Sequence, residues 1–298
     1  MPKQKWLEIR ILLPETLQEE AGIFLTGWSG RGVVLEDAAE IDSSPRLAGI
    51  RAYLPAGEFT ADIRQDLFTY LDRLAALGYR IGELQQQFIE EEDWERAWQI
   101  HFKARRLVGR FIIRPPWEEY NSTGPEVVLT IYPGMAFGTG RHPSTWLCLK
   151  ALEEVTYNWS QHPPRWVLDV GTGTGILGLA AARLGARVLA IDVDPEALAA
   201  ARENILLNEL HDLMRVEDLS LSAIRQQFDL IFANLTAPDL QTLAESLAGR
   251  LLPEGQMIIS GFLQTDLPEM EERFRAQGLQ SVQTHLKDDW AVLVLKRR

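Results

Sequence analysis

The fold is decided by the stretch RWVLDVGTGTGIL, residues 165–177. Its first six residues have the pattern of a mostly apolar strand. Gly171, Gly173 and Gly175 then form a turn, and a helix of small residues follows as far as Leu184. Because glycine has no side chain, such a turn lets the backbone approach a nucleotide-like ligand at the start of a helix. The stretch therefore predicts an α/β domain that binds such a ligand at the turn that follows this strand.

Downstream of the turn, strand-like and helix-like segments alternate. They lie at residues 187–192, 195–207, 228–233, 238–251, 256–260 and 266–276. Such alternation indicates parallel strands with right-handed crossover helices. Two further strand-like runs, 279–286 and 290–295, predict a hairpin against one edge of the sheet. We expect an α/β fold with a seven-stranded, doubly wound sheet that ends in this antiparallel hairpin.

The first 90 residues have a different pattern, with no glycine-rich turn between strand and helix. The predicted strands and helices follow the order βαββαβ, with strands at 6–12, 32–35, 50–54 and 79–89 and helices from Pro14 and over 60–77. That order is typical of an α+β, ferredoxin-like sandwich, a fold that hosts many functions. Acidic residues followed by basic ones favour a connector helix, in which Trp94 and Trp98 share one face. We expect three parts: residues 1–90, a connector helix at 91–106 and a larger domain at 107–298.

Composition narrows the class of protein. The chain has 298 residues, 46% of them apolar, which is enough for the cores of two domains. It has no window of about 18 apolar residues, so we expect a soluble, cytoplasmic protein without a membrane partner. Cys148 is the only cysteine, which excludes intrachain disulfides, and we interpret it as a buried apolar residue. The net charge of −12 argues against direct nucleic-acid recognition and fits a basic partner better.

An acidic residue ends the strand after the glycine turn. Asp192 stands 19 residues beyond Gly173, where a carboxylate can accept hydrogen bonds from ribose hydroxyls. Asp169, at the start of the turn, is interpreted as orienting the turn through backbone amides. A nicotinamide oxidoreductase uses similar parts, but its GxGxxG fingerprint requires glycine where this chain has Ile176. The third glycine, Gly175, comes one position early, which favours an adenosine without a pyrophosphate.

A glycine-rich run, PGMAFGTGRHPST, lies upstream at residues 133–145. Its glycines predict unusual backbone dihedrals, and Pro143 begins the helix that carries Thr145. Such a loop either folds over a ligand or is structural, and the residues leave both alternatives open. His142 has no second histidine or carboxylate at ligand spacing, so we interpret it as a hydrogen-bonded loop histidine and expect no metal site.

Together these motifs resemble a known family. The runs PGMAFGTGRHPST, DVGTGTGIL, IDVDPEAL and NLTA, with the connector DWERAW, are similar to the ribosomal protein L-eleven methyltransferases. The resemblance covers roughly residues 90–298, and the N-terminal domain resembles the family mainly in layout. It implies a methyltransferase sheet, S-adenosylmethionine as the cofactor, and a ribosomal large-subunit protein as the substrate, held by the N-terminal domain. The cofactor-binding positions that it implies are Thr145, Gly171, Asp192 and Asn234, and we expect further contacts from Phe137, Gly138, Thr139 and Gly173.

Two positions depart from the family pattern. In this family the position of Asn234 is usually followed by two aliphatic residues and an alanine, whereas here the second of the two is Thr236, which has a hydroxyl. This difference concerns the choice of substrate. Thr174 stands where serine is commoner, which keeps the hydroxyl. The loop after Asn234 also lacks the Asn-Pro-Pro-Tyr of methyltransferases with planar targets, so a flexible aliphatic amine is favoured over a flipped adenine.

The expected reaction is a direct in-line displacement, in which a neutral amine attacks the methyl carbon of the sulfonium. A lysine amine has an ordinary pKa of about 10.4, so the site must favour its neutral form by desolvation. Asn234 is the candidate for orienting the amine, and no general base is assigned because positioning alone can suffice. The alternatives are a methyltransferase of another protein or of a small molecule, a nicotinamide-dependent oxidoreductase, and a binding protein that has lost activity.

Overall fold

The computed structural model describes residues 5–29, 33–36, 47–90, 99, 102–122, 124–133, 140, 142–156 and 165–297. The chain divides into two compact units, Met1–Phe102 and Lys103–Arg298. The boundary falls inside the connector helix expected over residues 91–106, of which 91–98, with Trp94 and Trp98, lie outside the described residues. The prediction of helix as far as residue 106 is wrong, because Arg105 and Arg106 pair with another strand in an antiparallel ladder.

The N-terminal unit has strands and helices in the order predicted from the sequence. They are β1 (Lys5–Pro14), η1 (Glu15–Leu17), α1 (Gln18–Ser29), β2 (Val34–Leu35), β3 (Leu47–Pro55), η2 (Ala56–Glu58), α2 (Ala61–Ala76) and β4 (Leu84–Glu90). The sheet order is β2-β3-β1-β4, and all three strand pairs are antiparallel. The Thr60 hydroxyl accepts a hydrogen bond from the Ile63 N–H, which explains why α2 begins there.

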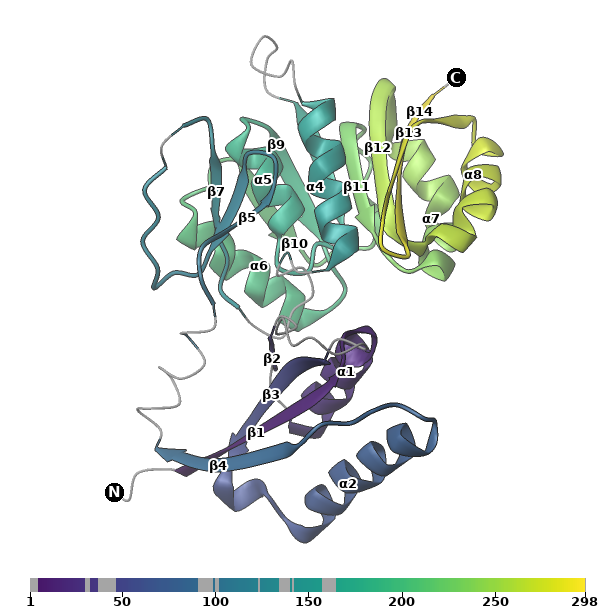
Figure 1. Ribbon diagram of the computed structural model, residues 1–298. Coiled ribbons are helices and arrows are strands. Elements are labelled where there is room, and N and C mark those ends of the chain that lie inside the picture. The colour runs from purple at the N-terminus through teal and green to yellow at the C-terminus, as the bar shows by residue number, and fades with distance from the viewer. Residues whose placement is uncertain are drawn as a thin grey trace. The chain divides into compact units, whose positions relative to one another are not determined.

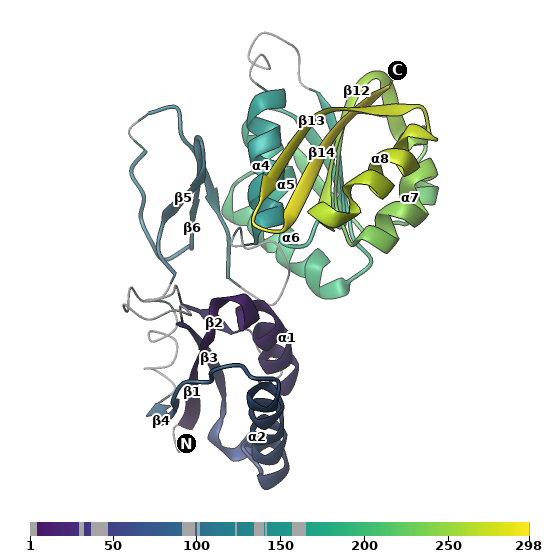
Figure 2. The same ribbon diagram turned by 45° about the vertical axis from the view of Figure 1, so that its right-hand side comes forward.

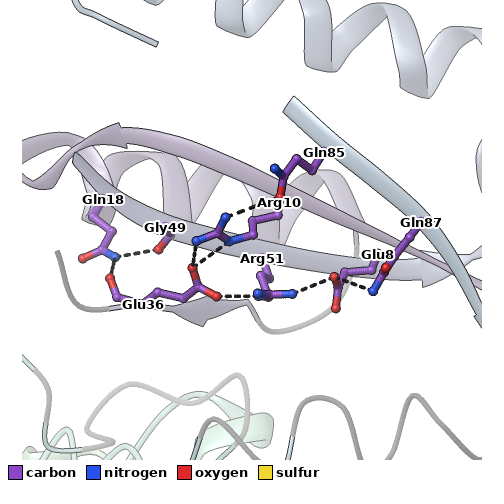
Figure 3. A network of polar contacts seen from close by, with 8 residues as sticks. All are labelled: Glu8, Arg10, Gln18, Glu36, Gly49, Arg51, Gln85 and Gln87. Atoms are coloured by element: carbon purple, nitrogen blue, oxygen red, sulfur yellow. Dashed lines mark hydrogen bonds and ion pairs between the residues drawn. The ribbon is translucent and has the colours of Figure 1, made fainter. Parts of the chain in front are cut away.

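The two faces of the N-terminal sheet differ in chemistry. Alternate residues of β1, such as Ile9 and Ile11, are buried with apolar residues of α1 and α2. The opposite face carries a polar network, drawn in Figure 3, in which Arg51 donates to both Glu8 at 2.7 Å and Glu36 at 2.5 Å. Arg10 donates to Glu36 at 2.8 Å. Burial alone raises the pKa of Glu36, but the two arginines outweigh it and hold that pKa below its ordinary value. Because these side chains come from β1, β3 and the residue after β2, their pairing fixes the strand register.

The larger unit contains one long sheet and one short one. Its helices and 3-10 turns are α4 (Pro143–Val155), α5 (Ile176–Arg183), α6 (Pro195–Leu207), η4 (Leu221–Ala223), α7 (Ala237–Arg250), η5 (Gln264–Asp266) and α8 (Leu267–Arg275). Its strands are β5 (Arg105–Val108), β6 (Phe111–Arg114), β7 (Val127–Thr130), β8 (Trp166–Val170), β9 (Arg187–Ile191), β10 (Met214–Glu217), β11 (Phe228–Asn234), β12 (Leu251–Leu263), β13 (Leu279–Lys287) and β14 (Trp290–Arg297).

The long sheet has seven strands in the order β10-β9-β8-β11-β12-β14-β13. The first five strands run parallel, and β14 is antiparallel to both β12 and β13. Helices α4, α5 and α6 pack on one face, and α7 and α8 pack on the other (Figures 1 and 2). The chain runs outward from β8 through β9 to β10 and then crosses back to β11 on the other side of β8, so the order reverses beside β8. In doubly wound sheets, ligands bind outside the carboxyl ends of the strands at such a reversal.

The three-stranded sheet of β5, β6 and β7 has no counterpart in the sequence prediction. Its strands have four residues each, too short for a clear alternation, and β7 pairs in parallel with β6. Phe111 and Leu129 are nevertheless fully buried in the same core as α4 and α5. The larger unit therefore begins at Lys103 and not at residue 107 as expected. Within the described residues, no helix combines the length and the apolar composition required to cross a membrane.

The carboxylate of Asp169 lies in the core beneath the glycine turn. It is 1% exposed, near the end of β8. Its Oδ2 accepts a hydrogen bond from the Thr172 hydroxyl at 2.7 Å and another from the Gly178 N–H at 3.0 Å. Burial raises the pKa of this carboxyl to about 6, although both hydrogen bonds oppose the shift. Asp169 thus joins the turn to α5, through one hydroxyl and one helix amide.

We expect Asp169→Asn to fold and to remove a pH dependence of stability. The folded-state pKa of about 6 lies above the ordinary aspartate value of about 3.9, so the folded protein binds more protons between these values and its free energy of unfolding falls as the pH rises. Asparagine offers an oxygen to the same donors without a charge, so the variant should gain up to about 3 kcal/mol at pH 7. Urea unfolding from pH 4 to pH 7 measures both effects. An equal pH slope in the two proteins would contradict the prediction.

Candidate functional site

Three glycines give the turn after β8 its shape. Gly171, Gly173 and Gly175 have φ angles of 67°, 55° and 84°, in the left-handed region that side chains disfavour. The N–H groups of Gly171 and Thr172 both donate to the Ile191 carbonyl, at 3.0 and 3.1 Å, so the turn is held against the end of β9. The turn lies at the carboxyl edge of the sheet, where the sequence pattern predicts that a ligand binds.

Asp192 is joined directly to this turn. Its Oδ2 accepts a hydrogen bond from the Gly173 N–H at 2.9 Å, and its Oδ1 accepts from the Val193 and Asp194 N–H groups at 2.8 and 3.1 Å. The residue is half-buried, directly after β9. A carboxylate has roughly four acceptor positions, so three backbone bonds leave about one for a ligand hydroxyl. The structure thus brings the two motifs together, with Asp192 supporting the turn as well as facing its ligand edge.

The end of β11 closes the other side of the turn. A Cβ at Gly171 would lie 2.3 Å from Leu235 Cδ2, so the end of β11 is close to the turn, and the φ of 67° at Gly171 further disfavours a side chain there. Leu235 is itself held by its N–H, which donates to the Ser260 carbonyl at 3.0 Å. Asn234, the last residue of β11, therefore lies at the same edge as the glycine turn. Its Oδ1 is buried and has no hydrogen-bond partner among the described residues.

Thr145 lies in the first turn of α4 and is fully buried. The preceding His142 caps this helix, accepting from the Ser144 N–H at 3.1 Å, and its ring packs edge-on against Trp290 at 4.3 Å between centroids. Trp290 pairs with Leu263 at the carboxyl end of β12, so the start of α4 is at the ligand edge of the sheet. The Thr145 hydroxyl also lacks a hydrogen-bond partner in the part of the chain that the structure describes.

Two of the buried polar atoms without partners in the described residues, Thr145 Oγ1 and Asn234 Oδ1, lie at this edge of the sheet and fit a polar ligand there. An unpaired buried hydroxyl or amide oxygen costs about 1–3 kcal/mol. A ligand that hydrogen-bonds Thr145 Oγ1 and Asn234 Oδ1 would remove that cost. Phe137, Gly138 and Thr139, the other expected contacts, lie outside the described residues.

Other candidate residues have structural roles. His142 is a helix cap, as its interpretation as a hydrogen-bonded histidine predicted, and no cluster of metal-ligating side chains occurs in the described residues. Cys148 is fully buried, and burial raises the pKa of its thiol. The Thr236 hydroxyl donates to Asp239 Oδ2 at 2.6 Å and caps α7, which accounts for a hydroxyl at that position without a substrate.

Sequence reasoning missed two buried asparagines, Asn204 in α6 and Asn208 at its C-cap. Asn204 hydrogen-bonds the glycine turn at Thr174. The available signal was the residue type: asparagine is unfavourable inside a helix unless its side chain finds partners.

Comparison with known proteins gives a consistent result. The ribosomal protein L11 methyltransferase (PrmA) family matches residues 5–298. The chain is 37% identical over 302 residues to the ribosomal protein L11 methyltransferase of Pelobacter propionicus, with 98% of each chain covered. It is 36% identical to that of Chloroflexus aurantiacus, over 100% of this chain and 99% of the relative.

A solved structure extends the comparison to three dimensions. The crystal structure of ribosomal protein L11 methylase from Lactobacillus delbrueckii subsp. bulgaricus matches with a TM-score of 0.60 at 33% sequence identity, covering 66% of this chain and 100% of the other. The family match reaches into the N-terminal unit, where the sequence motifs had shown only a likeness in layout. With a family match over residues 5–298 and relatives that align from end to end, the chain belongs to the ribosomal protein L11 methyltransferases.

Proposed function

We propose that this protein transfers methyl groups from S-adenosylmethionine to amine nitrogens of ribosomal protein L11, on lysine side chains, on the N-terminal amine, or on both. Family membership supports the class of reaction and the substrate. The observation that carries the proposal is the meeting of the glycine turn, Asp192 and the end of β11 at one edge of the sheet. This edge lies beside β8, where the strand order reverses.

The residues at this edge fit S-adenosylmethionine. Gly171 and Gly173 have no side chain that would block the approach of a ligand to the turn, and Asp192 has about one acceptor position left for a ribose hydroxyl. Thr145 Oγ1 supplies an unpartnered polar atom for the cofactor, and Asn234 Oδ1 supplies another for the incoming amine. When bound, S-adenosylmethionine supplies a methyl group on a positively charged sulfur.

The chain's own task is to present a neutral amine in line with that methyl group. A lysine amine with a pKa of about 10.4 is almost wholly protonated at neutral pH, so a site that excludes water must favour the free base. We assign Asn234 the role of accepting an N–H of the amine through Oδ1, which directs the nitrogen lone pair. Positioning of this kind can lower a barrier by about 7–11 kcal/mol, so no general base is assigned.

We also propose roles for the two units. The antiparallel sheet order β2-β3-β1-β4 with two helices supports a ferredoxin-like N-terminal domain. Residues 1–92 contain 9 Lys or Arg and 16 Asp or Glu, a net charge of −7, which suits a basic protein partner rather than a nucleic acid. We therefore infer that the N-terminal domain binds the ribosomal protein and that the larger unit catalyses the methyl transfer. We also infer that the enzyme works in the cytoplasm.

Calorimetric titration of the full chain tests the cofactor. S-adenosylmethionine should bind, and NADH should neither bind nor compete, because Ile176 occupies the place of the third glycine in the dinucleotide fingerprint. Tight binding of NADH together with no binding of S-adenosylmethionine would overturn the proposed function. Mass spectrometry of purified ribosomal protein L11 after incubation with enzyme and S-adenosylmethionine then identifies the methylated amines.

Asp192→Ala should weaken S-adenosylmethionine binding by roughly 10- to 100-fold, since a charge-assisted hydrogen bond contributes about 1.5–3 kcal/mol. The matched control is Asp194→Ala, which removes a nearby carboxylate that caps α6 at Glu196 N but does not bond the glycine turn. The control should lose some thermal stability and keep its affinity. Equal affinities for the two variants in calorimetry would place the ribose contact elsewhere.

A fragment that starts at Lys103, and so keeps β5 intact, should still bind S-adenosylmethionine, because every proposed cofactor contact lies at residue 137 or later. It should fail to methylate intact ribosomal protein L11 at the rate of the full chain. If the soluble fragment binds the cofactor and methylates the protein at the full rate, the N-terminal domain has no role in recognition.

A further inference from the structure

Asn204, inside α6, and Asn208, the C-cap residue of that helix, are both fully buried. Asparagine disfavours helix interiors such as the position of Asn204. Asn204 and Asn208 are four residues apart, so their side chains lie on the same face of the helix. A buried amide without partners costs free energy, and both side chains are hydrogen-bonded. Their partners are main-chain groups of two segments far away in the sequence.

Asn208 acts as an additional strand neighbour for β7. Its Oδ1 accepts from the Thr130 N–H at 2.9 Å, and its Nδ2 donates to the Thr130 carbonyl at 2.6 Å. The same Nδ2 donates to the Asn204 carbonyl at 2.7 Å. The contacts of Asn208 therefore concern β7 and α6 alone.

Asn204 joins two segments instead of one. Its Oδ1 accepts from the Tyr132 N–H at 2.8 Å, two residues after β7 ends, and its Nδ2 donates to the Thr174 carbonyl at 2.9 Å. Thr174 lies between Gly173 and Gly175, both with left-handed φ angles. A turn of glycines has many accessible conformations, so an external hydrogen bond to its central carbonyl restricts it strongly.

Gly140, within the glycine-rich run, also lies close to the start of α5. A Cβ added to Gly140 would lie 3.3 Å from the Ile176 side chain, in the first turn of α5. Tyr132, before that run, and Gly140, within it, are thus both linked to residues 174–176. Asn204 supplies the polar part of this link from a helix that contributes none of the expected cofactor contacts.

We propose that Asn204 is a positioning residue for the cofactor site: its amide holds the Thr174 carbonyl, and so the glycine turn, in the conformation that accepts the ligand. This inference rests on the proposed function, since it takes S-adenosylmethionine as the ligand of the turn. Asn204 itself touches only main-chain groups and is not a catalytic residue.

The test compares Asn204→Asp with Asn208→Asp in the full chain. Each variant keeps an acceptor for its main-chain N–H partner, Tyr132 or Thr130, and loses its donors, and each places a carboxyl group in the core, so both should be destabilised. Asn204→Asp should weaken S-adenosylmethionine binding by about 10-fold or more, whereas Asn208→Asp should change it by less than about 3-fold. Calorimetry at a temperature where circular dichroism shows both variants folded measures this. Equal losses of affinity would show a structural role for both and overturn the proposal.

Amide hydrogen exchange without ligand separates this inference from the proposed function. Asn204→Asp should speed exchange in the peptide that covers residues 171–176, and Asn208→Asp should not. Unchanged exchange there would overturn the inference even if S-adenosylmethionine binds the native protein. Faster exchange in a protein that fails to bind S-adenosylmethionine would instead leave Asn204 as the support of the turn and remove the proposed ligand. If either aspartate variant does not fold, the pair Asn204→Ala and Asn208→Ala is compared by the same criteria.

Discussion

The hydrogen bonds that hold the glycine turn after β8 are the constraint on which the site depends. Asp169 holds the turn by accepting hydrogen bonds from the Thr172 hydroxyl and the Gly178 N–H. The Ile191 carbonyl accepts two more from N–H groups of the turn. Asp192 then bonds the turn at Gly173. Without these partners, a turn with three alternating glycines would carry a large conformational entropy and would not present one surface to a ligand. The conformation of the turn therefore depends on the acceptors that surround it.

The position of that turn follows from the topology of the sheet. β9 and β11 lie on opposite sides of β8, so Asp192 and Asn234 follow strands that flank the turn. The two faces of the sheet have separate cores, and α4 belongs to the first of them. Its capped start brings Thr145 to the same edge. Residues 145, 171, 192 and 234 thus lie at the same edge of the sheet, because parallel strands end together there and a helix from outside the alternation begins there.

The sequence predicted those helices and strands that have a clear local pattern of apolar residues. The helix expected over 60–77 is α2 at Ala61–Ala76, and the helix expected over 195–207 has those bounds. Of the seven expected strands, six were located, and β10 was not. The sheet of β5, β6 and β7 was missed because its four-residue strands are too short for a clear alternation. The bond from Asn204 to Tyr132 spans 72 residues and leaves no periodic signal. Contacts from Phe137, Gly138 and Thr139 stay predictions.

The order of the last two strands has a consequence for how the sheet is assembled. β14 follows β13 in the chain but lies inside it in the sheet, between β12 and β13. Val292 and Val294 enter one core and Leu293 and Leu295 the other, so β14 completes both. β13 pairs with no other described strand, so it can join the sheet only together with β14 or after it. Folding therefore cannot proceed strictly along the chain, and during synthesis both apolar faces stay incomplete until residue 297 is available.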